Sequence, residues 1–566
     1  GGGTIIFNGN LTGSTGGMFR AENSTTVQVN GATNTFTSTR VGAESNAIFA
    51  CNSATCFGDN ANTIYMGGGT VALQVSNTFT NNFQTSLTTV DVSRLTANDN
   101  VSITGTNSTV NDDLRIDQLT AGKSLQFTGT ATLNGNLEVY GNNTTSDIKF
   151  DGGLTGAGGV TVQSGNAWMS APHTFDGIVT VKSGAVAKAD QIDSLGSSLG
   201  ATVVESGGSL VLESGAGDVT SAEPLQIAGS GVASTAYAGA IYGVGTNDFT
   251  LTGTVALTDD ATVYSSSIGD NVALNGVISG TADLTLIGQF SGGGSGSVTI
   301  GGASPNTYVG DTNITGGTVY FEKTGAITGD LNVESTDPGT NRSHAYFYNS
   351  SSVMSDSGIL TMGPNDEDGI TFGEDGETIG GLVGTSGVVQ IQTSGDKVII
   401  DQGFDSTYAG TFYTDGNTGT IEKRGTGALT LTGDYQAIND EITFLATEGT
   451  LVVNGTLRTT NGGNVNINGG KLKGTGTVRN VTATSGTLAP GNSPGTLSVS
   501  TLTLNSSTTF EQEIAGPVAG TSYDQVISNG AVNLGDATLS VKPSYTPSAG
   551  QVFTIITGPS ITGTFK

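Results

Sequence analysis

Short segments in which apolar side chains alternate with Thr, Ser or Asn recur from one end of this 566-residue chain to the other. An alternation of period two is typical of a β-strand with one buried face and one face in water. Gly-rich turns separate the segments, and their Asn-Gly and Gly-Gly pairs adopt positive φ angles at little energetic cost. Clear examples of the alternation are residues 160–162, 178–181, 251–255, 429–431, 465–467 and 497–499.

The phase of the alternation predicts where the chain bends. Leu497 and Val499 share one phase. Leu502 and Leu504 share the other, so the chain must turn a corner between the two pairs to bury both of them. Frequent corners, without the tight hairpin turns of an antiparallel sandwich, are typical of a coil that winds around its own axis.

The length of the chain also favours a coil, because a one-domain sandwich rarely exceeds about 250 residues whereas a solenoid extends by adding turns. We therefore predict an all-β fold, a right-handed parallel β-helix (solenoid) with a C-terminal capping region. The handedness follows from the strong preference for right-handed crossovers. With about 20–30 residues per turn, the solenoid would have roughly 20–25 turns stacked about 4.8 Å apart.

Composition excludes several classes of protein. Lys and Arg number 19 against 48 Asp and Glu, and the resulting net charge of −29 argues against nucleic-acid binding. No apolar run reaches the roughly 18 residues that span a bilayer as a helix. The 89 glycines show no three-residue period, which excludes collagen, and the dominant residue types are poor helix formers.

We expect three regions along the chain. Residues 1–150 are predicted to be a β-rich region of further turns or a cap, residues 151–485 the repetitive solenoid, and residues 486–566 its C-terminal end and cap. Because the first residue is Gly1 and no signal peptide is visible, we expect a segment of a longer product.

The two cysteines, Cys51 and Cys56, are separated by four residues. We favour a disulfide that closes this short loop, which would suit an oxidising compartment outside the cytoplasm. The alternative is a pair of buried free thiols that behave as small apolar side chains.

One acidic segment is a candidate Ca²⁺ site, because carboxylate oxygens that converge in a turn suit this hard cation. The candidate ligands are Asp366, Glu367, Asp368 and Asp375, with Glu374 and Glu377 nearby. Pro364 occupies the expected first ligand position, so the segment matches the Ca²⁺-loop pattern only in part. The alternative is a solvated loop outside the coil. We expect no other cofactor.

Tyr346, Phe347 and Tyr348 form the one aromatic cluster in the sequence. As a strand, this segment places the two tyrosines on one face and Phe347 on the other. The cluster is either a contact for a glycan or protein partner or an aromatic stack along the sheet. The only histidines, His173 and His344, are far apart in the sequence, so we predict no catalytic triad or two-histidine metal site.

Several segments resemble the passenger-associated strand repeat of bacterial autotransporters, which reads roughly Asn-Thr-Tyr-x-Gly-x-Thr-x-Ile-x-x-Gly-x-Leu/Val. Residues 306–319 follow this pattern from Asn306, Thr307 and Tyr308 to Val319, and residues 174–184 are a weaker copy. Further family-like stretches are residues 377–384, 408–412, 422–433 and the Pro-Gly-Asn-Ser-containing segment 486–497. The resemblance covers the chain from about residue 152 onward and implies a secreted bacterial β-helix whose repeats are scaffold.

We therefore expect a non-enzymatic extracellular protein at the bacterial cell surface, associated with the outer membrane, that acts as an adhesin or structural component. Its expected partners are glycans or proteins of a host or neighbouring cell, or copies of itself. Two alternatives remain at this point. One is a subunit of a self-assembling fibre or surface lattice. The other is a polysaccharide-degrading β-helix enzyme or phage spike, which would need clustered carboxylates on one face.

Overall fold

The computed structural model describes the chain apart from a set of short segments, namely residues 1, 15, 88–90, 144, 192, 214, 216, 234–236, 267–268, 292–293, 336–341, 349–351, 374–375, 415, 436–440 and 458–461. The described residues form β-strands joined by turns, and none of them is helical. The strands pair in parallel and build a β-solenoid of about 20 turns, which confirms the predicted fold class. Within these described residues, no helix is long and apolar enough to cross a membrane.

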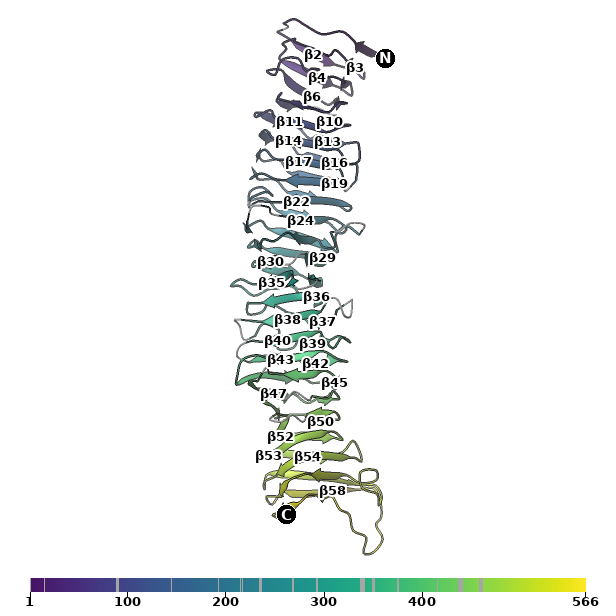
Figure 1. The fold of residues 1–566 in the computed structure, drawn as a ribbon, viewed down its shortest axis with the longest axis vertical. Helices are drawn as coiled ribbons and strands as arrows, with labels where there is room; N and C mark the ends of the chain where they lie inside the picture. Colours follow the sequence, from purple (N-terminus) through teal and green to yellow (C-terminus); the bar gives the residue numbers. More distant parts are fainter. Residues whose placement is uncertain are drawn as a thin grey trace. The chain divides into compact units, whose positions relative to one another are not determined.

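The chain divides into two compact units. The first comprises Gly1–Leu284 and Gly294–Val298, and the second comprises Thr285–Gly293 and Thr299–Lys566. Each unit is a stack of parallel turns (Figure 1).

A typical turn of the first unit contains three short strands. One such turn comprises β13 (Leu114–Gln118), β14 (Ser124–Phe127) and β15 (Ala131–Leu133). The next comprises β16 (Leu137–Gly141), β17 (Asp147–Phe150) and β18 (Leu154–Gly156). Each strand pairs in parallel with its counterpart one turn later, so three sheets run along the unit.

The register explains why the alternating pattern folds this way. Leu114 is buried and lies beside Leu137 of the next turn. The next residue along the strand, Arg115, lies beside Glu138 and faces outward. Every turn therefore adds apolar side chains to the same interior rows. A fully buried Leu, Ile or Val contributes about 1.5–3 kcal/mol, so a narrow core is sufficient when it repeats at each turn.

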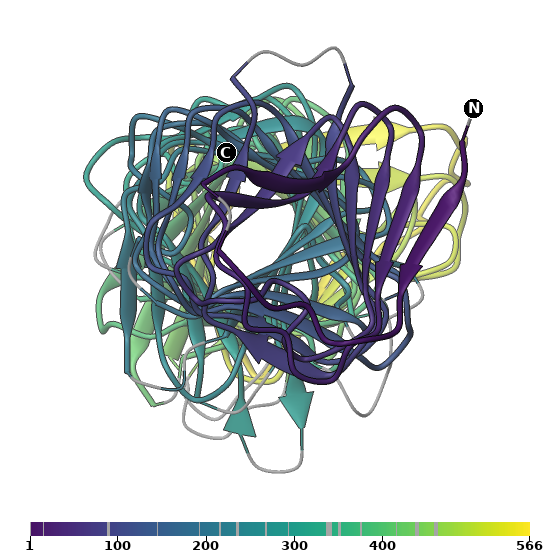
Figure 2. The same ribbon diagram turned by 90° about the horizontal axis from the view of Figure 1, so that it is seen from above.

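Residues 1–150 consist of turns of the same kind. The parallel strands β3 (Thr26–Val29), β5 (Ile48–Cys51) and β7 (Thr70–Leu73) follow one another on a single face. Figure 2, viewed from above, shows the purple and blue turns of this unit wound around a common interior. Phe49 and Phe57 fill the interior here, with stacked ring centroids 5.8 Å apart.

The second unit contains two faces that bear the candidate sites. On one face, β36 (Thr312–Phe321), β38 (Ser343–Phe347), β40 (Gly369–Phe372) and β43 (Val388–Ile391) pair in order. On another, β39 (Ile359–Met362), β42 (Gly381–Gly384), β45 (Ser406–Tyr408) and β48 (Ala428–Leu431) pair in order. All of these pairs are parallel.

The predicted corner after Val499 lies inside one strand, β54 (Thr496–Thr503). Leu497, Val499, Leu502 and Leu504 are all buried, and at the bend the pairing of β54 passes from β56 (Gln525–Ser528), which ends opposite Val499, to β57 (Ala531–Asn533), which begins opposite Leu502. The last residues then fold back against the final turn. The ring of Phe565 packs on Phe510 at 5.3 Å, and the backbone N–H of Lys566 donates to the carbonyl of Ala537.

Candidate functional site

The side chains that carry the passenger resemblance are structural supports. Tyr308 is buried, and its hydroxyl group contacts the Thr312 hydroxyl and the carbonyl of Ala326. The side-chain amide of Asn306, also buried, donates to the same carbonyl at 2.7 Å. These contacts satisfy backbone groups at a corner of the coil, which would otherwise be unpaired. The motif therefore specifies the shape of a turn.

A second copy of this support lies at the end of β45. Tyr408 is buried, and its hydroxyl donates to the carbonyl of Gly387 at 2.9 Å and to that of Thr411 at 3.1 Å. Its ring packs edge-on against Phe412, with centroids 5.3 Å apart. The same residue type therefore performs the same task about 100 residues later in the chain.

Cys51 and Cys56 are joined by a disulfide, with Cα atoms 5.4 Å apart. Both side chains are buried beside the solenoid interior, where β5 ends. The bond closes a short turn and holds Phe57 against Phe49. Its role in this position is that of a local staple.

The three described members of the acidic cluster face different partners. Glu367 forms an ion pair with Arg342 at 2.7 Å, and Asp366 accepts a hydrogen bond from the Ser386 hydroxyl. Asp368 is buried. Its two oxygens accept the backbone N–H groups of Ser335 and Ser343, each at 2.9 Å.

Asp375 and Glu374 lie outside the described residues. Glu377 turns to a separate segment, where its carboxylate accepts N–H bonds from residues 352, 353 and 354. Among His, Cys, Asp and Glu side chains in the described part of the chain, no group of three or more is placed to hold a metal ion. The Ca²⁺ interpretation therefore remains a prediction that rests on the undescribed carboxylate.

The aromatic cluster forms a stack along the sheet. Tyr346 in β38 lies directly beside Tyr320 in β36, with ring centroids 5.3 Å apart, and Tyr348 stacks on Tyr346 at 5.5 Å with an interplanar angle of 8°. Phe347, on the opposite face of the strand, points inward and is buried. Because the tyrosine rings face one another, their broad faces are not presented to a ligand. This geometry favours the stacking interpretation.

The two histidines lie in different units and have separate surroundings. His173 is buried, and its Nδ1 accepts the backbone N–H of Leu154 at 3.0 Å. Burial lowers the pKa of His173 to about 4. His344 stacks on Tyr346 at 4.3 Å and hydrogen-bonds the Thr371 hydroxyl through Nε2 at 2.8 Å. Both imidazoles serve packing.

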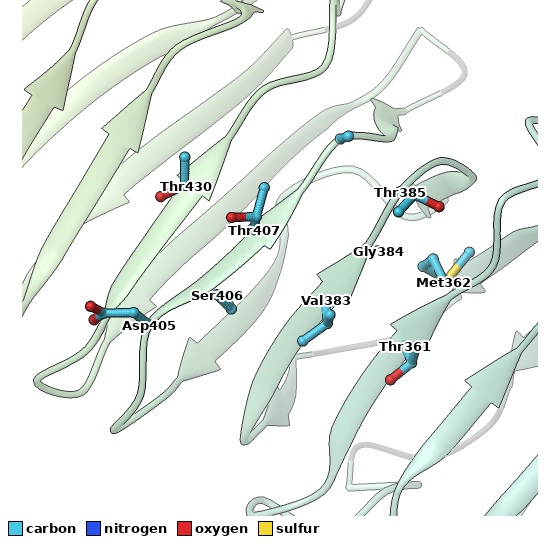
Figure 3. A pocket seen from close by; sticks show the side chains of 10 residues that line it. Thr361, Met362, Val383, Gly384, Thr385, Asp405, Ser406, Thr407 and Thr430 are labelled. Carbon is cyan, nitrogen blue, oxygen red and sulfur yellow. The ribbon is translucent and has the colours of Figure 1, made fainter. Parts of the chain in front are cut away.

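Sequence reasoning missed an open groove on the second unit (Figure 3). The groove crosses β39, β42, β45 and β48 and has a volume of about 590 Å³. Its lining residues are Thr361, Met362, Val383, Gly384, Thr385, Asp405, Ser406, Thr407, Ala409 and Thr430. The one signal in the sequence is that threonines occupy outward positions of three of these strands.

The register brings the outward side chains of the groove into a row. Thr361 pairs with Val383, and Thr407 pairs with Thr430 one turn further on. Figure 3 shows these side chains along successive strands, with Asp405 at the end of the turn that precedes β45. The Asp405 carboxylate accepts the backbone N–H of Ala428 at 2.8 Å, which fixes its position.

Comparison with known proteins gives no family for the chain. None of the protein-family models scanned matches it, and the search of curated proteins returns no match. The chain's own geometry is therefore what bears on its function.

Proposed function

We propose that this chain is the passenger-like β-solenoid of a bacterial extracellular surface protein, and that it acts without catalysis as an adhesin or structural surface component. The observation that carries the proposal is the structural use of the repeat motif. Tyr308 and Tyr408 support corners of the coil from inside, as expected of scaffold repeats. The outer faces are then left for contact.

The outer faces offer hydrogen-bonding groups in regular rows. In the first unit, Thr109, Thr132, Thr155 and Thr174 lie side by side on β12 (Ser108–Val110), β15, β18 and β20 (Thr174–Phe175). Each hydroxyl both donates and accepts, and neighbours in such a row are about 4.8 Å apart. Many weak contacts of this kind add up when the partner surface also repeats.

A second row lies near the C-terminus of the second unit. Its members, from β52 (Asn464–Gly474) to β60 (Ser560–Thr562), are Asn466, Thr482, Thr503, Asn533 and Thr562. All five side chains are exposed. A row of uncharged polar groups suits contact with hydrated, neutral surfaces, in contrast to the strongly acidic character of the chain as a whole.

Two features support a location outside the cell. The Cys51–Cys56 disulfide is stable in an oxidising compartment. Only 19 Lys and Arg occur in 566 residues, which leaves few cleavage points for trypsin-like proteases. Both features would help a protein persist in a protease-containing environment.

Two measurements, antibody labelling of intact cells and attachment of a deletion strain, test this proposal. Intact source cells are labelled with an antibody against the chain, and a deletion strain serves as the control. We expect labelling without permeabilisation, and weaker attachment of the deletion strain to cells or to polysaccharide-coated surfaces. Labelling only after permeabilisation, or unchanged attachment, would contradict the proposal.

The two alternatives give different results with the purified chain. A fibre subunit would scatter light increasingly as concentration rises and would form filaments visible by electron microscopy. A polysaccharide-degrading enzyme would release new reducing ends from its substrate. For a contact protein we expect a concentration-independent scattering mass per chain and no release of reducing ends.

A further inference from the structure

The groove of Figure 3 runs along the stacking direction of the second unit. Its walls come from four strands that pair consecutively, β39, β42, β45 and β48. Three inter-strand steps of about 4.8 Å give a length of roughly 14 Å. A site of this length and of about 590 Å³ is large enough for several units of a linear polymer.

Threonine hydroxyls line the groove without partners of their own. The side chains of Thr361, Thr407 and Thr430 point outward from β39, β45 and β48, with Val383 of β42 between the first two (Figure 3), and none of the three hydroxyls makes a hydrogen bond within the described protein. Each hydroxyl offers one donor and two acceptor sites. A ligand rich in hydroxyl groups would satisfy all of them.

Val383 on β42 lies beside Thr361 and gives the groove an apolar strip between the hydroxyl-bearing strands. An apolar strip flanked by hydroxyls matches the surface of a sugar ring, which has C–H faces and a polar edge. Beside the groove, just before β45, the anchored Asp405 carboxylate adds a strong acceptor.

Phe404 lies next to Asp405 and is 39% exposed. The Cζ–Cε1 edge of its ring lies against Gly381 in β42, since a Cβ atom on that glycine would come within 2.6 Å of Cζ and 2.9 Å of Cε1. The ring is thus held in place along one edge while much of it remains in contact with water. An exposed aromatic ring beside a polar groove is a stacking platform for a sugar.

Charge and sheet pairing exclude other kinds of ligand. The lining residues include a carboxylate and contain no Lys, Arg or His, so an acidic polymer would be repelled. A peptide that binds by strand addition needs an open sheet edge, whereas β42 is paired on both sides, with β39 and β45. An uncharged glycan has neither problem.

We propose that this groove binds a single uncharged glycan chain, which lies across successive turns with one sugar stacked on Phe404. The proposal deepens the surface-contact function and rests on it for its biological setting. The hydroxyls of Thr361, Thr407 and Thr430 bond sugars along the chain, the sugar between Thr361 and Thr407 packs on Val383, and Asp405 accepts from a sugar hydroxyl beside the groove.

Calorimetric titration of the purified full chain tests the proposal. The probes are cellohexaose and mannohexaose as uncharged oligosaccharides and hexagalacturonate as the acidic counterpart. We expect binding of at least one uncharged probe and weaker or no binding of hexagalacturonate. The proposal is overturned if neither uncharged probe binds at millimolar concentration, or if the acidic probe binds more tightly.

Three variants locate the binding in the groove. We expect Phe404→Ala to weaken binding about tenfold or more, and Thr407→Val, which keeps the shape but removes the hydroxyl, to weaken it about two- to tenfold. Gly381→Ala would displace the Phe404 ring without removing it and should also weaken binding. Thr180→Val, on β21 (Val179–Val181) of the other unit and outside the groove and both polar rows, is the matched control and should leave affinity unchanged.

Binding that is unaffected by both Phe404→Ala and Thr407→Val would place the ligand elsewhere and refute the groove. Circular dichroism of each variant shows whether the fold is retained. The outcome of the glycan-binding experiment can be distinguished from the outcome of the surface-display experiment. A displayed, adhesive chain with no groove binding refutes only this inference, whereas groove binding by a chain that is never displayed refutes only the surface function.

Discussion

Glu223 is a carboxylate enclosed by the first unit and only 4% exposed. Its side chain accepts a hydrogen bond from the Thr202 hydroxyl at 3.2 Å. Burial raises the pKa of Glu223 to about 7, because loss of water disfavours the charged form more than this hydrogen bond favours it. The residue therefore makes the stability of its turn depend on pH.

Because the pKa of Glu223 is higher in the folded chain than in the unfolded one, folding is favoured at low pH, and this contribution is lost as pH rises from about 4.5 through about 7. We predict that Glu223→Gln, which is neutral at every pH, stabilises the protein at pH 8 by up to about 3 kcal/mol relative to wild type. At pH 4.5 the difference should be close to zero. Denaturant unfolding of both proteins at the two pH values measures it, and an equal difference at both values would contradict the prediction.

Individual residues differ in how far the sequence predicts their roles. The close spacing of Cys51 and Cys56 was enough to favour a disulfide, because only a local turn is needed to join them. The alternation was enough to place Phe347 on the face opposite Tyr346 and Tyr348, and that face is the buried one. The position of Phe404 could not be predicted in this way, because Phe404 lies in a turn, outside the alternating segments. Its ring fits against the strand only because Gly381 on the preceding turn has no side chain.

At the scale of the element, the Cys51–Cys56 bond fixes the turn that follows β5. A loop this short restricts few unfolded conformations, so the expected contribution to stability is about 2 kcal/mol. We predict that replacing both residues by Ala increases amide hydrogen exchange in β5 and in its partners β3 and β7. The strands of the second unit are the internal control. Unchanged exchange in β5 would show that the bond stabilises nothing locally.

The pairing of β36 with β38 places Tyr320 over Tyr346. Stacked aromatic pairs contribute about 0.5–1.5 kcal/mol beyond the area that they bury. We predict a coupling free energy of about 1 kcal/mol in a double-mutant cycle with Tyr320→Thr and Tyr346→Thr, measured by denaturant unfolding. A coupling near zero would mean that the rings are packed independently. The same cycle with Val at Thr132 and Thr155, an exposed cross-strand pair of hydroxyls, provides the comparison.

At the scale of the whole chain, the uniform alternation predicted the fold class because a β-solenoid uses the same strand-and-turn unit at every step. The same uniformity means that the division into two compact units could not be predicted from the sequence, because similar alternating segments and Gly-rich turns occur on both sides of residues 284–299. The groove was equally invisible. It depends on Thr361, Thr407 and Thr430 coming into line across turns, and that register is set by turn lengths rather than by the strands themselves.

Within each unit, a turn is supported mainly by the turns on either side, so damage to one turn should remain local. Leu125 in β14 is fully buried and lies between Val101 of β11 (Val101–Ile103) and Ile148 of β17. We predict that Leu125→Ala, a change that costs about 2–5 kcal/mol in a packed core, increases hydrogen exchange in β11, β14 and β17.

The distant turns of the same unit distinguish a solenoid from a globular core. Strands β3 and β5 share no direct pairing with β14, so their exchange in Leu125→Ala should match that of the wild type. Hydrogen exchange followed by mass spectrometry resolves the two sets of strands in one experiment. A uniform increase throughout the first unit would mean that its turns unfold together, as in a single cooperative domain, and that the nearest-neighbour description does not hold for this chain.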